Sequence, residues 1–284
     1  MLAYHAAYVE YLDSTLASQW LKVATYNVYH CADLRYARND NTDPWTADLV
    51  NIENIANFML EYDLDVMTMN ETCRYSTRYD DGNTAQAERI ANYLTQKTGE
   101  QYYWAFARAE IQSTGEFGNA IVSKYPIAKI TNGYLDDTTR YAQDSNGTTL
   151  CLGHAELNVG GQTVSVLFTH LSLSATDRLL QIETVKNKVQ SIQVADPNRA
   201  IIFMGDLNEN PYDSNGMYDA LLTFLSPTAP KNQLPLTYSS ERPVRTIDYI
   251  MHSSNVVSKD LYVPGDVLYS DHLPVIVTIG LPKT

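Results

Sequence analysis

The chain has little of what marks a membrane, disulfide-rich or DNA-coating protein. No apolar run reaches the length of about 18 residues that a membrane-spanning helix needs, so a membrane span is not expected. The three cysteines, Cys31, Cys73 and Cys151, have no CxxC spacing and permit at most one disulfide. Lys and Arg number 20 against 33 Asp and Glu, and the net charge of −13 repels polyanions, which disfavours sequence-specific DNA binding.

The amino-terminal segment also lacks the features of a secretory leader. Residues 1–20 contain no Lys or Arg, and they carry Glu10 and Asp13. We therefore expect a soluble protein, with the cytoplasm favoured and secretion still open if a leader has been removed. A monomer is the simplest expectation.

The segments that are present predict one mixed α/β domain over residues 1–284, with a helical extension at 1–20. No repeat, low-complexity tract or linker interrupts the chain. Apolar spacing predicts helices at 2–17, 47–62, 84–98, 175–194 and 216–225. Runs of β-branched and aromatic residues predict strands at 21–28, 64–69, 103–108, 119–123, 151–158, 163–169, 200–205, 246–251 and 274–280. The stretches 131–149 and 227–243 predict long surface loops.

Polar residues gather at the ends of several predicted strands. The positions are Asn27, Glu71, His170, Asp206, Asn208, Asp248, Asp271 and His272. Two carboxylates about 4 Å apart at an effective dielectric near 20 repel by about 4 kcal/mol. A cluster of this kind therefore needs a cation, and oxygen-rich ligands without cysteine favour Mg²⁺ or Mn²⁺.

Seven short motifs then follow one another in a distinctive order. They are TYN at 25–27, NE at 70–71, GNAIVSKYPI at 118–127, FTHL at 168–171, GDLNENP at 205–211, IDYI at 247–250 and SDHLPV at 270–275. Each motif alone occurs by chance, but the ordered series resembles the endonuclease/exonuclease/phosphatase superfamily. The resemblance implies an α/β fold, a four-layer sandwich of two mixed β-sheets packed face to face with helices outside. It also implies a phosphoester-hydrolysing site at one edge of the sheets.

The resemblance assigns roles to the residues of the cluster. Glu71 would be the main metal ligand, with Asn27 and Asp271 beside it. His272, oriented by Asp248, would be the general base, because a carboxylate on one ring nitrogen leaves the other nitrogen free to take a proton.

Further residues would act on the phosphoryl group. Asp206 and Asn208 would position it and the attacking water, and His170 would donate a hydrogen bond to its developing charge. Arg178 and Gln181 match a common pattern of the family, although a solvated helix face or an internal ion pair explains them as well.

Four other residues are candidates for binding substrate. Arg74, Arg78 and Arg140 could grip a phosphate through the planar guanidinium fork, or could be exposed loop arginines. Asn119 could hydrogen-bond across the cluster or simply begin a strand.

Together these observations predict a Mg²⁺- or Mn²⁺-dependent phosphoester hydrolase. A phosphodiesterase or nuclease-like enzyme is the first expectation, acting on a nucleic acid, a lipid headgroup or a small molecule. The alternatives are a phosphomonoesterase on a small-molecule, sugar or lipid phosphate, and a catalytically silent binding protein on the same fold.

Overall fold

A computed structural model describes most of the chain: residues 17–32, 49–77, 81–135, 149–214 and 216–283. The predicted helix at 2–17, apart from its last residue, and the candidate phosphate ligands Arg78 and Arg140 lie outside these ranges. Within them, no helix combines the length and the apolar character needed to cross a membrane.

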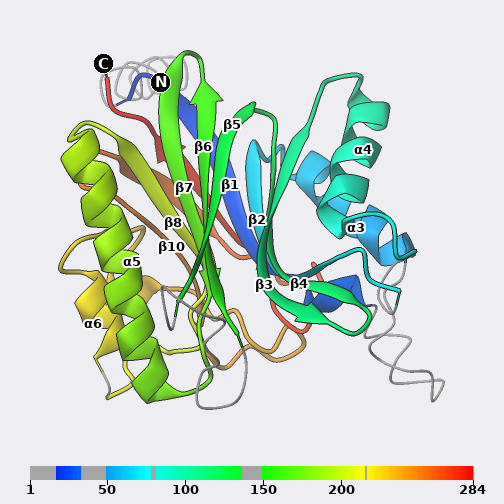
Figure 1. The fold of residues 1–284 in the computed structure, drawn as a ribbon. Coiled ribbons are helices and arrows are strands. Elements are labelled where there is room, and N and C mark those ends of the chain that lie inside the picture. The colour runs from blue at the N-terminus through cyan, green and yellow to red at the C-terminus, as the bar shows by residue number, and fades with distance from the viewer. Residues whose placement is uncertain (1–16, 33–48, 78–80, 136–148, 215, 284) are drawn as a thin grey trace, which may run out of the picture.

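The described chain forms two mixed six-stranded sheets that pack face to face (Figure 1). The first sheet contains β1 (Trp20–Asn27), β2 (Val66–Arg74), β3 (Tyr103–Gln112), β4 (Gly115–Ser123), β11 (Val257–Tyr262) and β12 (Val275–Gly280), in the order β11-β12-β1-β2-β4-β3. The second contains β5 (Ile127–Tyr134), β6 (Cys151–Val159), β7 (Gln162–His170), β8 (Ala200–Asp206), β9 (Ser226–Pro227) and β10 (Asp248–His252), in the order β5-β6-β7-β8-β10-β9.

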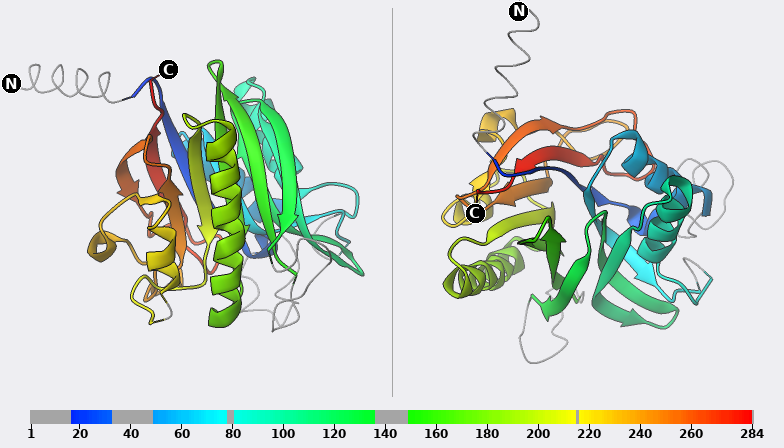
Figure 2. Two further views of the ribbon diagram at one scale, coloured as in Figure 1. Left: turned by 60° about the vertical axis from the view of Figure 1, so that its left-hand side comes forward. Right: turned by 90° about the horizontal axis from the view of Figure 1, so that it is seen from above.

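Helices cover the outer faces of both sheets, as the view from above in Figure 2 shows. They are α3 (Leu49–Glu61), α4 (Gln86–Thr98), α5 (Ala175–Ala195) and α6 (Met217–Leu221), with short 3₁₀ turns η1 (Tyr29–Cys31) and η2 (Lys231–Gln233). The helices α3 and α4 pack on the first sheet, and α5 and α6 pack on the second. The predicted four-layer α/β sandwich is confirmed.

Three apolar clusters hold these layers together. The central cluster joins the inner faces of the sheets through residues such as Val23, Val166 and Met204, all fully buried. On the outside, Ile55 of α3 and Val185 of α5 each belong to a cluster that fixes a helix to its sheet. Burying one such side chain stabilises the fold by about 1.5–3 kcal/mol, so the sandwich is a rigid support for its edge.

Strand register brings the polar strand ends to one edge. The parallel pair β1–β2 places Asn27 beside Asn70, and the parallel pair β7–β8 places His170 beside Asp206. The antiparallel strand β10 begins at this same edge, where Asp248 pairs with Asp206. Because parallel strands end together, residues from distant segments converge here.

The structure corrects several predicted boundaries. The predicted loop at 131–149 begins inside a strand, because β5 continues to Tyr134. The strands β5, β11 and the two-residue β9 were not predicted. Both β5 and β11 are edge strands with exposed polar residues, so they lack the apolar runs by which buried strands are recognised.

Candidate active site

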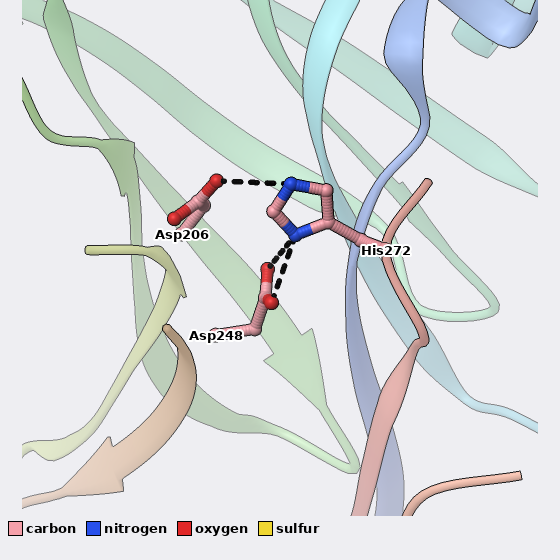
Figure 3. Close-up of side chains that lie close together, drawn as sticks. All are labelled: Asp206, Asp248 and His272. Atoms are coloured by element: carbon pink, nitrogen blue, oxygen red, sulfur yellow. Dashed lines mark hydrogen bonds and ion pairs between the residues drawn. The ribbon is translucent and has the colours of Figure 1, made fainter. Parts of the chain in front are cut away.

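The centre of the site is a histidine paired with an aspartate (Figure 3). His272 Nδ1 lies 2.9 Å from Asp248 Oδ2 and 3.2 Å from Oδ1, and both residues are buried. Asp248 stands at the first position of β10, where the sheet holds its backbone. A carboxylate in this position fixes the ring tautomer and leaves Nε2 facing the rest of the site.

A second carboxylate faces the other side of the imidazole. Asp206, at the end of β8, lies 3.6 Å from His272 Nε2 through its Oδ2. Burial disfavours the imidazolium, but Asp248 and Asp206 outweigh that effect and raise the pKa of His272 to about 10. Burial, with Asp206 adding to it, raises the pKa of Asp248.

His170 and Asn208 form a second polar pair beside Asp206. Asn208 Nδ2 lies 2.9 Å from His170 Nε2, and the same amide nitrogen donates to the carbonyl of Leu171 at 2.8 Å. His170 Nε2 lies 3.5 Å from Asp206 Oδ2. Asn208 has a φ of 55°, which turns the chain after β8 so that its side chain points back into the site.

Glu71 enters the site from the first sheet. It has a φ of 56°, and the register of β2 against β4 shifts between Met69 and Thr72. This bulge redirects the Glu71 side chain to the edge of the sheet. Asn27 Nδ2 donates to Glu71 Oε1 at 2.9 Å and to Asp206 Oδ2 at 3.1 Å.

Asn27 thus presents its amide nitrogen, rather than its oxygen, to the two carboxylates. Its Oδ1 accepts a hydrogen bond from the backbone N–H of Tyr29 at 3.2 Å. In this conformation Asn27 orients Glu71, and the role of Asn27 as a metal ligand stays a prediction.

Asp271 completes the acidic surface. The pKa of its carboxyl is raised, because burial and the nearby Glu71 carboxylate together outweigh the opposite effect of His272. The Asp271 Oδ1 accepts a hydrogen bond from Ser270 Oγ at 3.2 Å.

These residues surround a pocket of about 220 Å³. Its walls are formed by Glu71, His170, Leu173, Asp206, Asn208, Tyr238, Arg245, Ile247, Asp271 and His272. The structure therefore brings together six of the predicted site residues at one pocket, with Asn27 and Asp248 directly behind it.

Two predicted substrate ligands lie elsewhere. The Arg74 guanidinium is 2.6 Å from Glu116 Oε2 and lies over the Phe106 ring, and Arg74 does not line the pocket. Asn119 lies within β4 and accepts a hydrogen bond from Asn70 Nδ2 at 2.9 Å, so it supports the site from behind.

Asn70 is a supporting residue that the sequence analysis did not select. It is fully buried; its Nδ2 donates to the carbonyl of Thr169, and its Oδ1 accepts from the N–H of Asp206 at 2.9 Å. Asn70 in the first sheet thereby ties down β7 and β8 of the second. Its position directly before Glu71 was the one signal available.

Arg245 and Tyr238 were also missed. Arg245 lines the pocket, and its guanidinium donates to the carbonyl of Asn208 at 3.4 Å. The Tyr238 ring lies 4.8 Å from the His272 ring. Backbone bridges from Tyr238 to both Arg245 and His272 place these side chains, and such non-local pairing leaves no local pattern in the sequence.

The residues of the pocket fit a divalent cation. Glu71 and Asp271 are the less buried carboxylates, while Asp206, Asp248 and His272 have potential ligand atoms within 4.8 Å of one another. Asp248 is already bonded to His272, so Glu71 and Asp271 are the more open ligands. His170 Nδ1 is buried 3.9 Å from Glu71 Oε1 with no hydrogen-bond partner in the described part of the chain.

The two packed sheets with helices outside place the protein in the class of four-layer α/β sandwiches. The chain belongs to the endonuclease/exonuclease/phosphatase family, whose sequence model matches residues 24–272. None of the curated proteins matched the sequence.

Solved structures of the family share the fold. One is an endonuclease/exonuclease/phosphatase from Bacteroides vulgatus, with a TM-score of 0.68 and 16% identity over 93% of this chain and 100% of that chain. A second is a mannosyl-6-phosphatase from Bacteroides thetaiotaomicron, with a TM-score of 0.67 and 18% identity over 91% of this chain and 99% of that chain. A third is truncated TDP2 from Caenorhabditis elegans, with a TM-score of 0.63 and 17% identity over 94% of this chain and 99% of that chain.

Proposed function

We propose that this protein hydrolyses phosphate esters with the help of Mg²⁺ or Mn²⁺. The observation that carries the proposal is the His272–Asp248 pair, 2.9 Å apart, which opens onto a pocket lined by Glu71, Asp206 and Asp271. A paired imidazole suits proton transfer from water, and the carboxylates suit a hard cation.

His272 is the proposed general base. The pKa of about 10 is that of the site without a cation, where the neighbouring carboxylates favour the imidazolium. A cation held by those carboxylates would oppose their effect and lower this pKa, so that the neutral ring could accept a proton from water. Asp248 holds its Nδ1, so Nε2 is directed toward Asp206 and the pocket. Asp206 lies within 4 Å of both His272 and His170, where it can orient the attacking water. A positioned base of this kind contributes about 10²- to 10⁴-fold to a rate.

Two donors are proposed for the phosphoryl oxygens, His170 and Arg245, which both line the pocket. Asn208 Nδ2 lies 2.9 Å from His170 Nε2 and donates to the carbonyl of Leu171, so Asn208 is proposed to position His170. Donors fixed before the reaction stabilise negative charge as it develops on the phosphoryl group.

Glu71 and Asp271 are the proposed ligands of the cation, and Asn27 holds Glu71 in place. The bound cation would neutralise the phosphoryl charge and help the leaving oxygen depart. The positive charge of the cation would also offset the repulsion among the carboxylates at this edge.

For the substrate we propose a phosphodiester as the first class. A phosphomonoester on a small molecule is the second candidate, because the pocket of about 220 Å³ is small and its described lining residues include one arginine. The name of the mannosyl-6-phosphatase relative points to the same second class.

The test is a comparison of bis(p-nitrophenyl) phosphate with p-nitrophenyl phosphate, with Mg²⁺ or Mn²⁺ and then with excess chelator. We expect turnover of the diester that chelation abolishes. Faster turnover of the monoester would select the second class. Turnover that persists unchanged in chelator would contradict the metal-dependent mechanism, and no turnover of a wider panel of DNA, RNA, phospholipids and sugar phosphates would favour a silent binding protein.

A further inference from the structure

A second polar cavity lies on the outer face of the second sheet, away from the residues proposed for catalysis. It has a volume of about 580 Å³ between α5 and strands β5 and β6. Thr131, Asn187 and Lys188 supply polar groups to its wall, and Tyr134 and Leu152 supply apolar ones. None of its described lining residues belongs to the catalytic pocket.

Lys188 in this cavity makes no ion pair with a described residue. In the described part of the chain no carboxylate lies within 4.0 Å of its ammonium group. The neighbouring Glu156 is already approached by Lys129 at 3.9 Å and by Arg199 at 4.0 Å. Burial, and then repulsion from Lys129, lowers the pKa of Lys188, and the attraction of Glu156 offsets these effects only in part.

Other hydrogen-bonding groups in the wall are also open. Among the described residues, neither the Thr131 hydroxyl nor the Asn187 amide has a side-chain hydrogen bond. Thr131 pairs with His154 across β5 and β6, and His154 is neutral at physiological pH because burial, together with nearby cations, lowers its pKa to about 4. As far as the described lining residues go, the cavity thus presents one cation without an ion pair and two polar side chains without a hydrogen bond, in a protein whose net charge is −13.

The donor set indicates the ligand. A lysine is a point charge with three rotatable donors, whereas a planar carboxylate is best matched by the guanidinium fork of arginine, and no arginine is among the described lining residues. We propose that this cavity binds a small tetrahedral oxyanion of the phosphate type, with Lys188 as its counter-ion and Thr131 and Asn187 as further donors. The anion is either free phosphate or the phosphoryl group of a small molecule.

Calorimetric titration of the full, metal-free chain with inorganic phosphate at constant ionic strength tests the proposal. Lys188→Met keeps the length of the side chain and removes its charge, and we expect it to weaken binding by about tenfold or more. Lys186→Met is the matched control, since Lys186 lies on the same helix and pairs with Glu183 at 3.3 Å; its affinity should stay within about twofold of the wild type.

Phosphate binding at the catalytic pocket has to be separated from binding at this cavity. Arg245→Ala should leave the Lys188-dependent binding in place, and Lys188→Met should leave hydrolysis unchanged. Binding that survives Lys188→Met and disappears in Arg245→Ala would overturn the proposal, as would wild-type binding weaker than about 10 mM. Glycerol phosphate that binds more tightly than inorganic phosphate would assign the site to an organic phosphate, and equal affinities would assign it to the free anion.

Discussion

At the scale of single residues, the site depends on side chains that cross between the sheets. Asn70 hydrogen-bonds Asn119 in its own sheet and the backbone of Thr169 and Asp206 in the other. Asn27 does the same through Glu71 and Asp206. Asn27 therefore fixes the Glu71 carboxylate, a proposed cation ligand, relative to the Asp206 carboxylate of the other sheet.

Arg245 gives a test of phosphate binding at this scale. Removing its guanidinium takes a charged donor from the pocket, so Arg245→Ala should lower kcat/KM by about 10- to 100-fold, mainly through KM. Arg242→Ala is the matched control, because Arg242 is exposed in the same segment and does not line the pocket. Equal effects of the two substitutions in steady-state kinetics would remove Arg245 from the site.

His154 gives a prediction for stability against pH. Its pKa is about 4 in the folded protein, chiefly because of burial, and about 6.5 when unfolded, so the unfolded chain binds more protons between these values. Its contribution is therefore present above about pH 6.5 and is lost as the pH falls toward 4, by up to about 3 kcal/mol.

His154→Gln keeps a partner for Ser165 Oγ, which lies 3.1 Å from the histidine Nε2. Urea unfolding of both proteins at several pH values should show that the wild type loses more stability than the variant between pH 6.5 and 4. These limits are the pKa of His154 in the unfolded chain, about 6.5, and in the folded protein, about 4. Parallel curves would show that His154 does not titrate in this way.

Site residues within motifs could be predicted from the sequence, whereas residues placed by pairing with distant segments could not. Glu71, His170, Asp206, Asn208, Asp271 and His272 were all selected from motifs that stand at strand ends, and the strands do bring them together. Arg74 follows Glu71 closely in sequence, but its pairing with Glu116 depends on β4 beside it. Arg245 reaches the pocket through pairing with Tyr238, which no local pattern encodes.

At the scale of elements, a buried ion pair joins helix α5 to the turn after β8. Arg178 Nε donates to Glu209 Oε2 at 3.1 Å, and its Nη1 donates to the carbonyls of Ser172 and Leu173, each at 2.9 Å. Both charged residues are nearly inaccessible. Of the alternatives open for Arg178, the structure shows the internal ion pair.

Breaking this pair should lower stability, because the buried Glu209 carboxylate would be left without a partner. Arg178→Met is expected to lower the free energy of unfolding by about 3–5 kcal/mol. The double variant Arg178→Met, Glu209→Met should lose much less than the sum of the single variants, since it leaves no unpaired charge. Lys186→Met, which breaks an exposed pair on the same helix, should change stability by less than about 0.5 kcal/mol.

Denaturant unfolding measures the wild type, the two single variants, the double variant and Lys186→Met on one scale. A loss in Arg178→Met no larger than in Lys186→Met would show that the pair does not hold α5 in place. Additive effects in the double variant would show that the two charges do not interact.

Elements were predictable where their packing leaves a periodic trace. α3 and α5 carry apolar stripes against their sheets, and β8 is buried at every position, so each follows from its sequence. β11 has the sequence VSKDLY with no fully buried residue, because it is an edge strand. Its strand conformation depends on pairing with β12, which its own residues do not indicate.

At the scale of the whole molecule, the fold concentrates negative charge at one edge. Glu71 comes from the first sheet, Asp206 and Asp248 come from the second, and Asp271 precedes β12. The pairing of sheets is a global property, yet the order of the motifs predicted it because that order resembles a known family. The repulsion among these groups is offset by a cation in the proposed mechanism.

Cation binding should therefore stabilise the folded protein. Mn²⁺ at about 100 times its dissociation constant should add about 2.7 kcal/mol to the free energy of unfolding and raise Tm by several degrees. Glu71→Gln should lose most of this shift in differential scanning calorimetry, whereas Glu61→Gln, an exposed residue at the end of α3, should keep it. Equal shifts in both variants would place the cation elsewhere.

The most direct test of the central claim compares two buried histidines in one assay. His272 is bonded to Asp248 beside the pocket, while His252, at the other end of β10, is bonded to Ser258 Oγ at 3.1 Å away from it. With Mn²⁺ present, the initial rate of diester hydrolysis should fall by about 10²- to 10⁴-fold in His272→Gln and by less than about threefold in His252→Gln. Similar rates in the two variants would contradict the assignment of His272 as the catalytic base.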